Sequence, residues 1–125
     1  MNENTLFLIN HYDKKLDFRN LITLKESISI EKCDNLEIII TSKINKIIIS
    51  KSKNIVIKIN ETISGIDIEL SDDINIYPLL PTLNLSIIQS YKSSINIYLS
   101  DYIRIEDKND IPFKIIEEFS TINFL

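Results

Sequence analysis

Few side chains in this chain are of the types that perform acid–base, nucleophilic or metal chemistry. Its 125 residues include one histidine, His11, and one cysteine, Cys33. No carboxylate or nucleophile is spaced to meet His11, so the sequence predicts neither a Ser-His-Asp triad nor a histidine-rich metal site. Cys33 stands where matching phrases carry Ser52 and Ser71, which favours a small corner residue over a reactive thiol. We therefore expect no catalytic residue, metal or cofactor, and a protein that is not an enzyme.

The adjacent carboxylates of Asp72 and Asp73 are of a kind that can hold a cation. The matching phrases carry Asp34-Asn35 and Lys53-Asn54 at the same place. Because Asp and Asn tolerate tight backbone corners, a shared turn preference explains all three pairs without a bound ion.

A period of 19 residues relates these phrases. Apolar residues alternate with polar ones along most of the chain, which indicates β-strands, and β-branched isoleucine dominates. Similar residues recur in five sets: Ile28, Ile47, Ile66 and Leu85; Ile30, Ile49, Ile68 and Ile87; Leu36, Ile55 and Ile74; Ile38, Ile57, Ile76 and Ile95; and the corners Cys33, Ser52, Ser71 and Ser90. Two-strand units this short bury their apolar side only by stacking in register on one another. The sequence therefore predicts an all-β fold, a parallel β-helix (β-solenoid) forming a single domain over residues 1–125, rather than a sandwich of hairpins.

Three segments depart from the period. After Ser90 the phrase SYKSSINIYL is longer, which predicts an enlarged corner. Pro78 and Pro81 cannot donate to a sheet ladder and are expected at a coil corner. Residues 113–119 are expected to form at most a helical turn or two, and the segment 107–119 is expected to cap the open end of the stack.

Composition narrows the classes of partner. The formal net charge of −4 comes from interspersed charges of both signs, which argues against a nucleic-acid-binding surface. No stretch resembles a signal peptide, and no apolar run approaches the roughly 20 residues that span a bilayer. A single cysteine favours a reducing compartment. We expect a cytoplasmic protein with protein partners, no nucleic acid and no membrane.

The outward residues between the inward ladders are the candidates for a binding face. On the first sheet these are Ser29, Glu31, Ile48, Ser50, Asp67, Glu69, Ser86 and Ile88, and on the second Glu37, Ile39, Val56, Lys58, Asn75, Tyr77, Asn96 and Tyr98. The second set is favoured because outward tyrosines and branched aliphatics rimmed by polar groups suit a protein interface. Its selected members are Val56, Lys58, Tyr77 and Tyr98. The alternative is that these side chains only stabilise the strands by packing coil on coil.

The corners and strands resemble the C-terminal domain of adenylyl cyclase-associated protein, within the group that includes tubulin-binding cofactor C. The similar phrases are TLKESISIEKC from Thr23, SKINKIIISKSK from Ser42, SGIDIELSDD from Ser64, LPTLNL from Leu80, YKSSINIYL from Tyr91 and DIPFKIIEEF from Asp110. The resemblance implies a β-helix that binds monomeric actin, prefers its ADP-bound form, and either promotes exchange of ADP for ATP or sequesters the monomer. It also implies a cytoskeleton-associated location. By the same resemblance, exposed polar family positions fall on Lys43, Asn45, Lys46, Lys92, Ser93 and Ser94, which we add as actin-binding candidates.

The chain departs from this family in several places. About one coil of the family is missing between PTLNL and YKSSINIYL, and the N-terminal helical domain and proline-rich linker are expected to be absent. Relatives continue beyond STINFL into a final strand pair that two subunits exchange, so the sequence leaves open whether this chain forms a homodimer.

Two other functions remain as alternatives. Members of the cofactor C branch stimulate GTP hydrolysis with an exposed arginine that follows a pair of glutamines. The two arginines here, Arg19 and Arg104, lack that context. The second alternative is a scaffolding β-helix that binds another protein.

Overall fold

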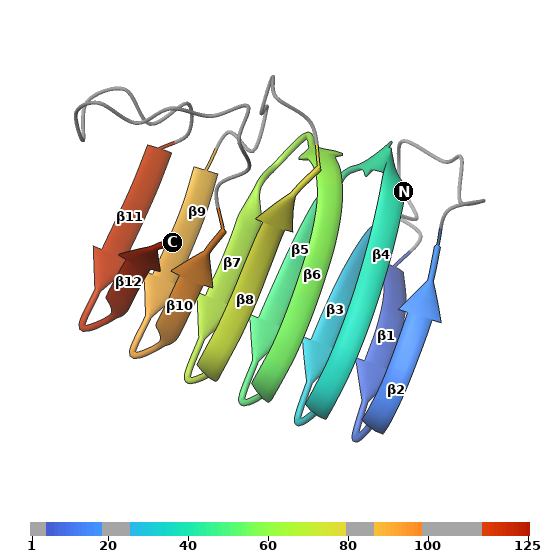
Figure 1. Ribbon diagram of the computed structural model, residues 1–125, viewed down its shortest axis with the longest axis horizontal. Helices are drawn as coiled ribbons and strands as arrows, with labels where there is room; N and C mark the ends of the chain where they lie inside the picture. The colour runs from blue at the N-terminus through green and yellow to red at the C-terminus, as the bar shows by residue number, and fades with distance from the viewer. Residues whose placement is uncertain (1–4, 19–25, 80–86, 99–113) are drawn as a thin grey trace.

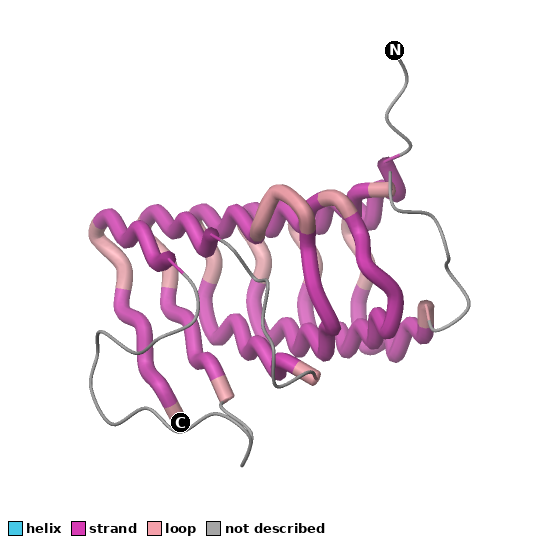
Figure 2. Tube along the Cα trace, turned by 90° about the horizontal axis from the view of Figure 1, so that it is seen from above, coloured by secondary structure: helices cyan, strands magenta, loops and turns pink. Residues whose placement is uncertain are grey.

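The computed structural model describes residues 5–18, 26–79, 87–98 and 114–125 and shows two parallel β-sheets packed face to face (Figure 1). The odd-numbered strands form one six-stranded sheet, in the order β1-β3-β5-β7-β9-β11, which we call sheet A. The even-numbered strands form the other, in the order β2-β4-β6-β8-β10-β12, which we call sheet B. Every pairing is parallel and joins strands two apart in sequence. The chain therefore winds as the predicted parallel β-helix, seen from above in Figure 2.

Each coil contributes one strand to each sheet. Sheet A contains β1 (Thr5–Ile9), β3 (Ser27–Glu31), β5 (Lys46–Ser50), β7 (Ile66–Glu69), β9 (Ile87–Tyr91) and β11 (Lys114–Glu118). Sheet B contains β2 (Tyr12–Asp17), β4 (Asp34–Ile44), β6 (Lys53–Thr62), β8 (Asp72–Pro78), β10 (Ser94–Ile97) and β12 (Thr121–Phe124).

The core consists of isoleucines that stack in register from coil to coil. Ile28 pairs with Ile47 and Ile47 with Ile66 in sheet A, and Ile38, Ile57 and Ile76 do the same in sheet B. These ladders are almost fully buried. Because each buried isoleucine side chain contributes roughly 1.5–3 kcal/mol, the ladders are the main favourable contribution to this stack. The sequence prediction is confirmed over the coils from β3 to β8.

The predicted register is wrong from β9 onward. Ile66 pairs with Ile88 and Ile68 with Ser90, so Ile88 is buried in the core and does not face outward. Ile66 and Ile88 are 22 positions apart, whereas Ile47 and Ile66 are 19 apart. Three additional residues therefore lie between β8 and β9, and the ladder does not run through Ile87.

The other predicted members of these sets change accordingly. Ile95 pairs with Ile74, and it is Ile97 that pairs with Ile76. Leu85 and Ser86 lie outside the described residues.

A line of hydrogen bonds runs along the corner between the two sheets. The hydroxyl of Ser71 donates to the carbonyl of Glu69, 2.8 Å away, and accepts the N–H of Ser52 at 3.2 Å. The same arrangement recurs at Ser52, Ser93 and Ser120. Cys33 takes the first position, with its buried Sγ 3.2 Å from the carbonyl of Leu8 and 3.3 Å from that of Glu31. The interpretation of Cys33 as a corner residue is confirmed.

The predicted corner Ser90 and its predicted enlargement are corrected. Ser93, not Ser90, occupies the corner beside Ser71. In earlier coils the corner contains a second residue with positive φ, such as Asn54 at 54° or Asp73 at 52°. Such residues tolerate this left-handed conformation better than most. The corner after Ser93 has no such residue, since Ser94 is followed directly by Ile95, so it is shorter rather than longer.

The C-terminal region is also strand rather than helix. Residues 114–118 form β11, which pairs with β9, and β12 pairs with β10. The described part of the expected cap is therefore another coil, while residues 107–113 lie outside the described part of the chain. Pro78, expected at a coil corner, is instead the last residue of β8 and pairs with Ile59, and Pro81 is not described.

Candidate partner-binding face

The outer face of sheet B presents two rows of side chains across its coils. Strand pairing aligns them as Lys15, Glu37, Val56, Asn75, Asn96 and Asn123 in one row and as Asp17, Ile39, Lys58 and Tyr77 in the other. Tyr98 continues the second row by stacking on Tyr77. The outward residues predicted for this sheet are thus confirmed as neighbours on one face.

Tyr77 and Tyr98 form the aromatic centre of this face. Their ring centroids are 4.2 Å apart and the rings are nearly parallel, with an interplanar angle of 7°. In-register stacking of parallel coils places like side chains directly above one another, which accounts for the geometry. Desolvation by the surrounding side chains, and then the hydrogen bond with Tyr98, raise the pKa of Tyr77 above its ordinary value. Both rings are half-buried, so each keeps surface that a partner can contact.

An asparagine ladder lies beside the tyrosines and binds the hydroxyl of Tyr98. The side-chain amide of Asn96 donates to Oδ1 of Asn75 at 3.0 Å, and that of Asn123 donates to Oδ1 of Asn96 at 3.1 Å. The hydroxyl of Tyr98 donates to the same Oδ1 of Asn75 at 3.3 Å. Asn75 is only 8% exposed and its own amide donates to the carbonyl and side chain of Asp73. This network holds the ring of Tyr98, and the ring of Tyr77 stacks on it.

Charged side chains border the aromatic pair on the side of the earlier coils. The ammonium group of Lys58 lies 2.9 Å from Oε1 of Glu37 and 5.9 Å from the ring centroid of Tyr77. Lys15 approaches the other oxygen of Glu37 at 3.4 Å. The hydrogen bond from Lys58 is the main reason that the pKa of Glu37 lies below its ordinary value. The face therefore combines an aromatic centre with a charged rim.

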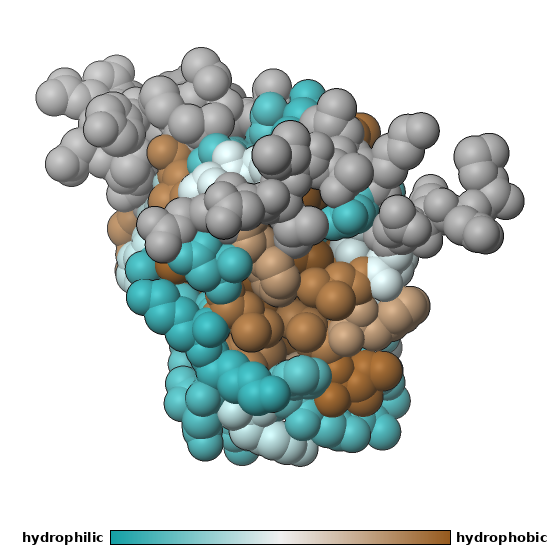
Figure 3. Space-filling view, turned by 90° about the vertical axis from the view of Figure 1, so that its right-hand side faces the viewer, coloured by the Kyte–Doolittle hydropathy of each residue, from teal (hydrophilic) through white to brown (hydrophobic). Residues whose placement is uncertain are grey.

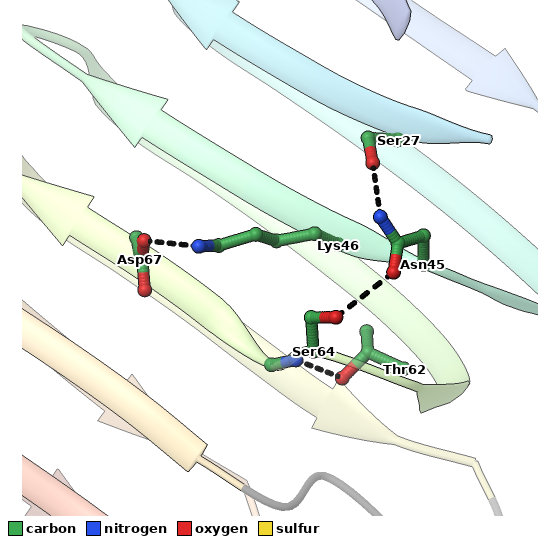
Figure 4. A network of polar contacts seen from close by, with 7 residues as sticks. Ser27, Asn45, Lys46, Thr62, Ser64 and Asp67 are labelled. Carbon is green, nitrogen blue, oxygen red and sulfur yellow. Dashed lines mark hydrogen bonds and ion pairs between the residues drawn. The ribbon is translucent and has the colours of Figure 1, made fainter. Parts of the chain in front are cut away.

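A second group of candidates lies at the edge where β4 turns into β5 (Figure 4). The side chain of Asn45 donates to Ser27 Oγ at 3.1 Å and accepts from Ser64 Oγ at 2.9 Å, joining three coils. Lys46 pairs with Asp67 at 2.7 Å, and Lys43 lies 3.8 Å from Glu61. These three residues thus have partners within the chain as well as exposed surface.

The third group lies at the opposite edge, in the β9–β10 corner. Figure 1 shows this corner at the lower edge and the β4–β5 connection at the upper edge. Lys92 is exposed and its ammonium lies 5.4 Å from the ring centroid of Tyr91. Ser93 is only 6% exposed and its hydroxyl is used in the corner ladder, which contradicts its expected exposure. Ser94 is half-buried at the start of β10. The structure therefore divides the ten candidates among three places.

Sequence reasoning missed a groove on the outer face of sheet A. It has a volume of about 440 Å³ and is lined by Ile48, Asp67, Ile68, Glu69, Gln89, Ser90, Tyr91, Ile116 and Glu118. Phe119 adds an exposed ring in edge contact with Tyr91. The prediction of a helical turn over residues 113–119 concealed the groove, although the outward alternation of Ile116 and Glu118 signals a strand.

Of the single histidine and the two arginines, only the histidine lies in the described part of the chain. Nδ1 of His11 lies 2.9 Å from the ammonium of Lys14. Arg19 and Arg104 lie outside the described residues. Within residues 5–18, 26–79, 87–98 and 114–125 no three His, Cys, Asp or Glu side chains gather as a metal site would require. The same part of the chain contains no helix of a length and hydropathy that would cross a membrane.

Comparisons with known proteins identify the family to which this chain belongs. The family described as adenylate cyclase associated (CAP) C terminal matches residues 2–102 and again residues 28–123, two overlapping alignments that together span nearly the whole chain. This chain belongs to the CAP C-terminal domain family. Such overlap is expected where successive coils resemble one another.

A solved structure supports the same assignment. The crystal structure of cyclase-associated protein from Cryptosporidium parvum matches with a TM-score of 0.76 and 26% sequence identity, covering 100% of this chain and 72% of that one. No curated protein matches the chain. The resemblance and the β-helix inferred from the sequence are both confirmed, while the partner-contacting residues of this CAP domain remain predictions.

Proposed function

We propose that this CAP C-terminal domain binds monomeric actin with the outer face of sheet B. Membership of the CAP family supports actin binding, and the stacked pair of Tyr77 and Tyr98 is the observation that selects this face. Aromatic side chains with restricted freedom are enriched among residues that dominate protein interfaces. Because Asn75 already binds Tyr98 and the two rings are stacked, little side-chain entropy is lost when a partner binds.

The remaining candidates extend this proposal along the face and its edges. Val56 and Lys58 adjoin the tyrosines on the preceding coil. Lys43 lies at the end of β4 in the same sheet, with Asn45 and Lys46 just beyond it. Lys92 and Ser94 lie at the opposite edge and serve as contacts only for a partner that spans the height of the sheet.

The proposed action is promotion of ADP/ATP exchange on the monomer, with sequestration as the other outcome. Such exchange needs no bond to be made or broken by this domain. A protein that binds actin more tightly when the nucleotide cleft is open shifts the monomer toward that state and accelerates nucleotide release. A preference for ADP-actin and a cytoplasmic, cytoskeleton-associated location belong to the same proposal.

The test measures release of a fluorescent nucleotide from ADP-actin monomers, in the absence of filaments, with and without the domain. Faster release supports a recycling factor, and slower release supports sequestration. An unchanged rate together with no co-migration with actin would reject both and leave the scaffolding alternative.

The face is tested with Tyr77→Ala/Tyr98→Ala, and Tyr91→Ala on sheet A is the matched control. We expect the double variant to weaken actin binding by roughly tenfold or more, as expected for central interface aromatics, and the control to bind normally. Circular dichroism confirms that both variants are folded. Equal binding by the double variant and the control would show that sheet B is not the contact face.

A further inference from the structure

The groove on the outer face of sheet A lies between two outward rows of side chains. Strand pairing across β5, β7, β9 and β11 aligns Ile48, Asp67, Gln89 and Ile116 in one row and Ser50, Glu69, Tyr91 and Glu118 in the other. All of these residues except Ser50 line the groove. The groove therefore crosses four neighbouring strands and runs along the stack.

The described lining of the groove is acidic. It contains the carboxylates of Asp67, Glu69 and Glu118 and neither lysine nor arginine. Asp67 is paired with Lys46 at 2.7 Å. Glu69 and Glu118 are exposed, and neither forms an ion pair with any residue in the described ranges. The groove thus has two carboxylates whose charge the described part of the chain leaves unneutralised.

Apolar surface lies among these charges. Ile116 is 41% exposed, Tyr91 is 37% exposed and Ile48 is half-buried. The ammonium of Lys92 lies 5.4 Å from the ring centroid of Tyr91. Elsewhere, on the side of the molecule where β1 and β2 lie, Figure 3 shows hydrophobic residues gathered together. The groove instead places apolar and charged side chains next to one another, so charge as well as apolar area selects its occupant.

The chemistry of the lining distinguishes among classes of partner. Partners rich in phosphate, such as a nucleic acid or an anionic membrane surface, are repelled by carboxylates. A polypeptide segment that carries lysine or arginine is attracted to them. Alternate side chains of an extended segment point to opposite sides. Basic side chains on one side of such a segment can therefore face Glu69 and Glu118, while apolar side chains on the other side face Ile48 and Ile116.

We propose that this groove is a second partner-binding site, which takes an extended segment of another protein with alternating basic and apolar residues. Four neighbouring strands span roughly 14 Å, the length of about five extended residues. The basic side chains pair with Glu69 and Glu118, and the aliphatic stem of a lysine packs along the ring of Tyr91 between them. The site is separate from the proposed actin-binding face and does not depend on actin binding.

The experiment titrates the isotope-labelled domain with a five-residue peptide of alternating lysine and leucine and follows the backbone amide chemical shifts. We expect saturable shifts at Asp67, Gln89 and Tyr91, and an affinity that falls as salt screens the carboxylates. A peptide of the same composition, with its lysines and leucines in two separate blocks, should bind more weakly. Absence of saturable shifts at the groove, or equal binding of the block peptide, would overturn the proposal.

Glu69→Gln/Glu118→Gln removes both charges while keeping the size of the side chains. We expect peptide binding to weaken roughly fivefold or more, because two ion pairs with the peptide are lost. The matched control is Glu31→Gln/Asp72→Asn, which removes the same charge outside the groove and should bind the peptide as the wild type does. Equal weakening in the two folded variants would show a general attraction to net charge and would contradict a site in the groove.

The two faces are tested separately because they point to opposite sides of the stack, as the two layers of strands in Figure 2 show. Tyr77→Ala/Tyr98→Ala should therefore bind the peptide as the wild type does. The variant Glu69→Gln/Glu118→Gln should in turn leave actin binding unchanged. Loss of peptide binding in the folded tyrosine variant would place the peptide on sheet B and overturn the proposal, whereas failure of actin binding alone would leave it intact.

Discussion

The coils from β3 to β8 and the coils from β9 to β12 have the same two-strand architecture but differ in their inward residues and in the length of their corners. In the central coils most inward positions are isoleucine or leucine and each corner contains a second positive-φ residue. In the last two coils Ser90 and Glu117 replace isoleucine, and the corners are one residue shorter. Because stability in a stack is close to a sum over coils and their contacts, it should be concentrated in the centre.

The largest expected difference in the free energy of unfolding comes from truncating an inward isoleucine to alanine. Ile57→Ala removes a fully buried side chain from the central ladder and should lower the free energy of unfolding by about 2–5 kcal/mol. Ile122→Ala removes a partly buried side chain from the last coil, and should lower it by about 1 kcal/mol. Urea unfolding followed by circular dichroism measures both. Equal losses would show that the terminal coil is as tightly packed as the centre.

The corner ladder offers a smaller contrast. Ser71→Ala leaves the buried N–H of Ser52 without its acceptor, which should lower the free energy of unfolding by about 1–3 kcal/mol. Ser120→Ala removes the matching acceptor for Ser93 at the open end, where water can replace it, so we expect less than about 1 kcal/mol. Hydrogen exchange at the amides of Ser52 and Ser93 reports each loss locally. A larger effect at Ser120 would reverse the inferred order.

The same contrast explains which features could be predicted from the sequence. In the central coils the two-residue alternation and the 19-residue period agree, so only one register buries the repeated isoleucines of both sheets together. Near β9 the chain offers adjacent isoleucines, Ile87 and Ile88, and two corner serines, Ser90 and Ser93. Local pattern cannot choose between them, because the choice depends on the three additional residues between β8 and β9. The run KIIEE is equally ambiguous, since a short apolar run fits helix or strand.

The candidate binding residues also separate into those whose positions could be predicted from the sequence and those whose positions could not. The rows containing Tyr77 and Tyr98 could be predicted because strand parity alone determines which residues face outward. The edge candidates could not be placed together, because the location of Lys43 or Ser93 depends on how each corner is built. The groove on sheet A was missed because it requires the pairing of β11 with β9, which the irregular segment before it conceals.

The smallest expected effect is a pH dependence confined to the first coils of sheet B. Glu37 lies between Lys15 and Lys58, whereas the aligned positions in the later coils are Asn75, Asn96 and Asn123, which do not titrate. The folded-state pKa of Glu37 is lowered, so its contribution to stability is fully present above the unfolded value of about 4.3 and is lost as the pH falls through the lowered folded value.

Glu37→Gln should therefore reduce the loss of stability below about pH 4.3, while changing neutral-pH stability by no more than about 1 kcal/mol, as is usual for exposed ion pairs. Asn96→Asp, which places a carboxylate at the aligned position without flanking lysines, is the comparison variant and should not gain this acid-sensitive stabilisation. Urea unfolding at pH 3 and pH 7 measures both. An unchanged difference between the two pH values in Glu37→Gln would show that the lysines flanking Glu37 contribute charge to the face but no measurable stability to the fold.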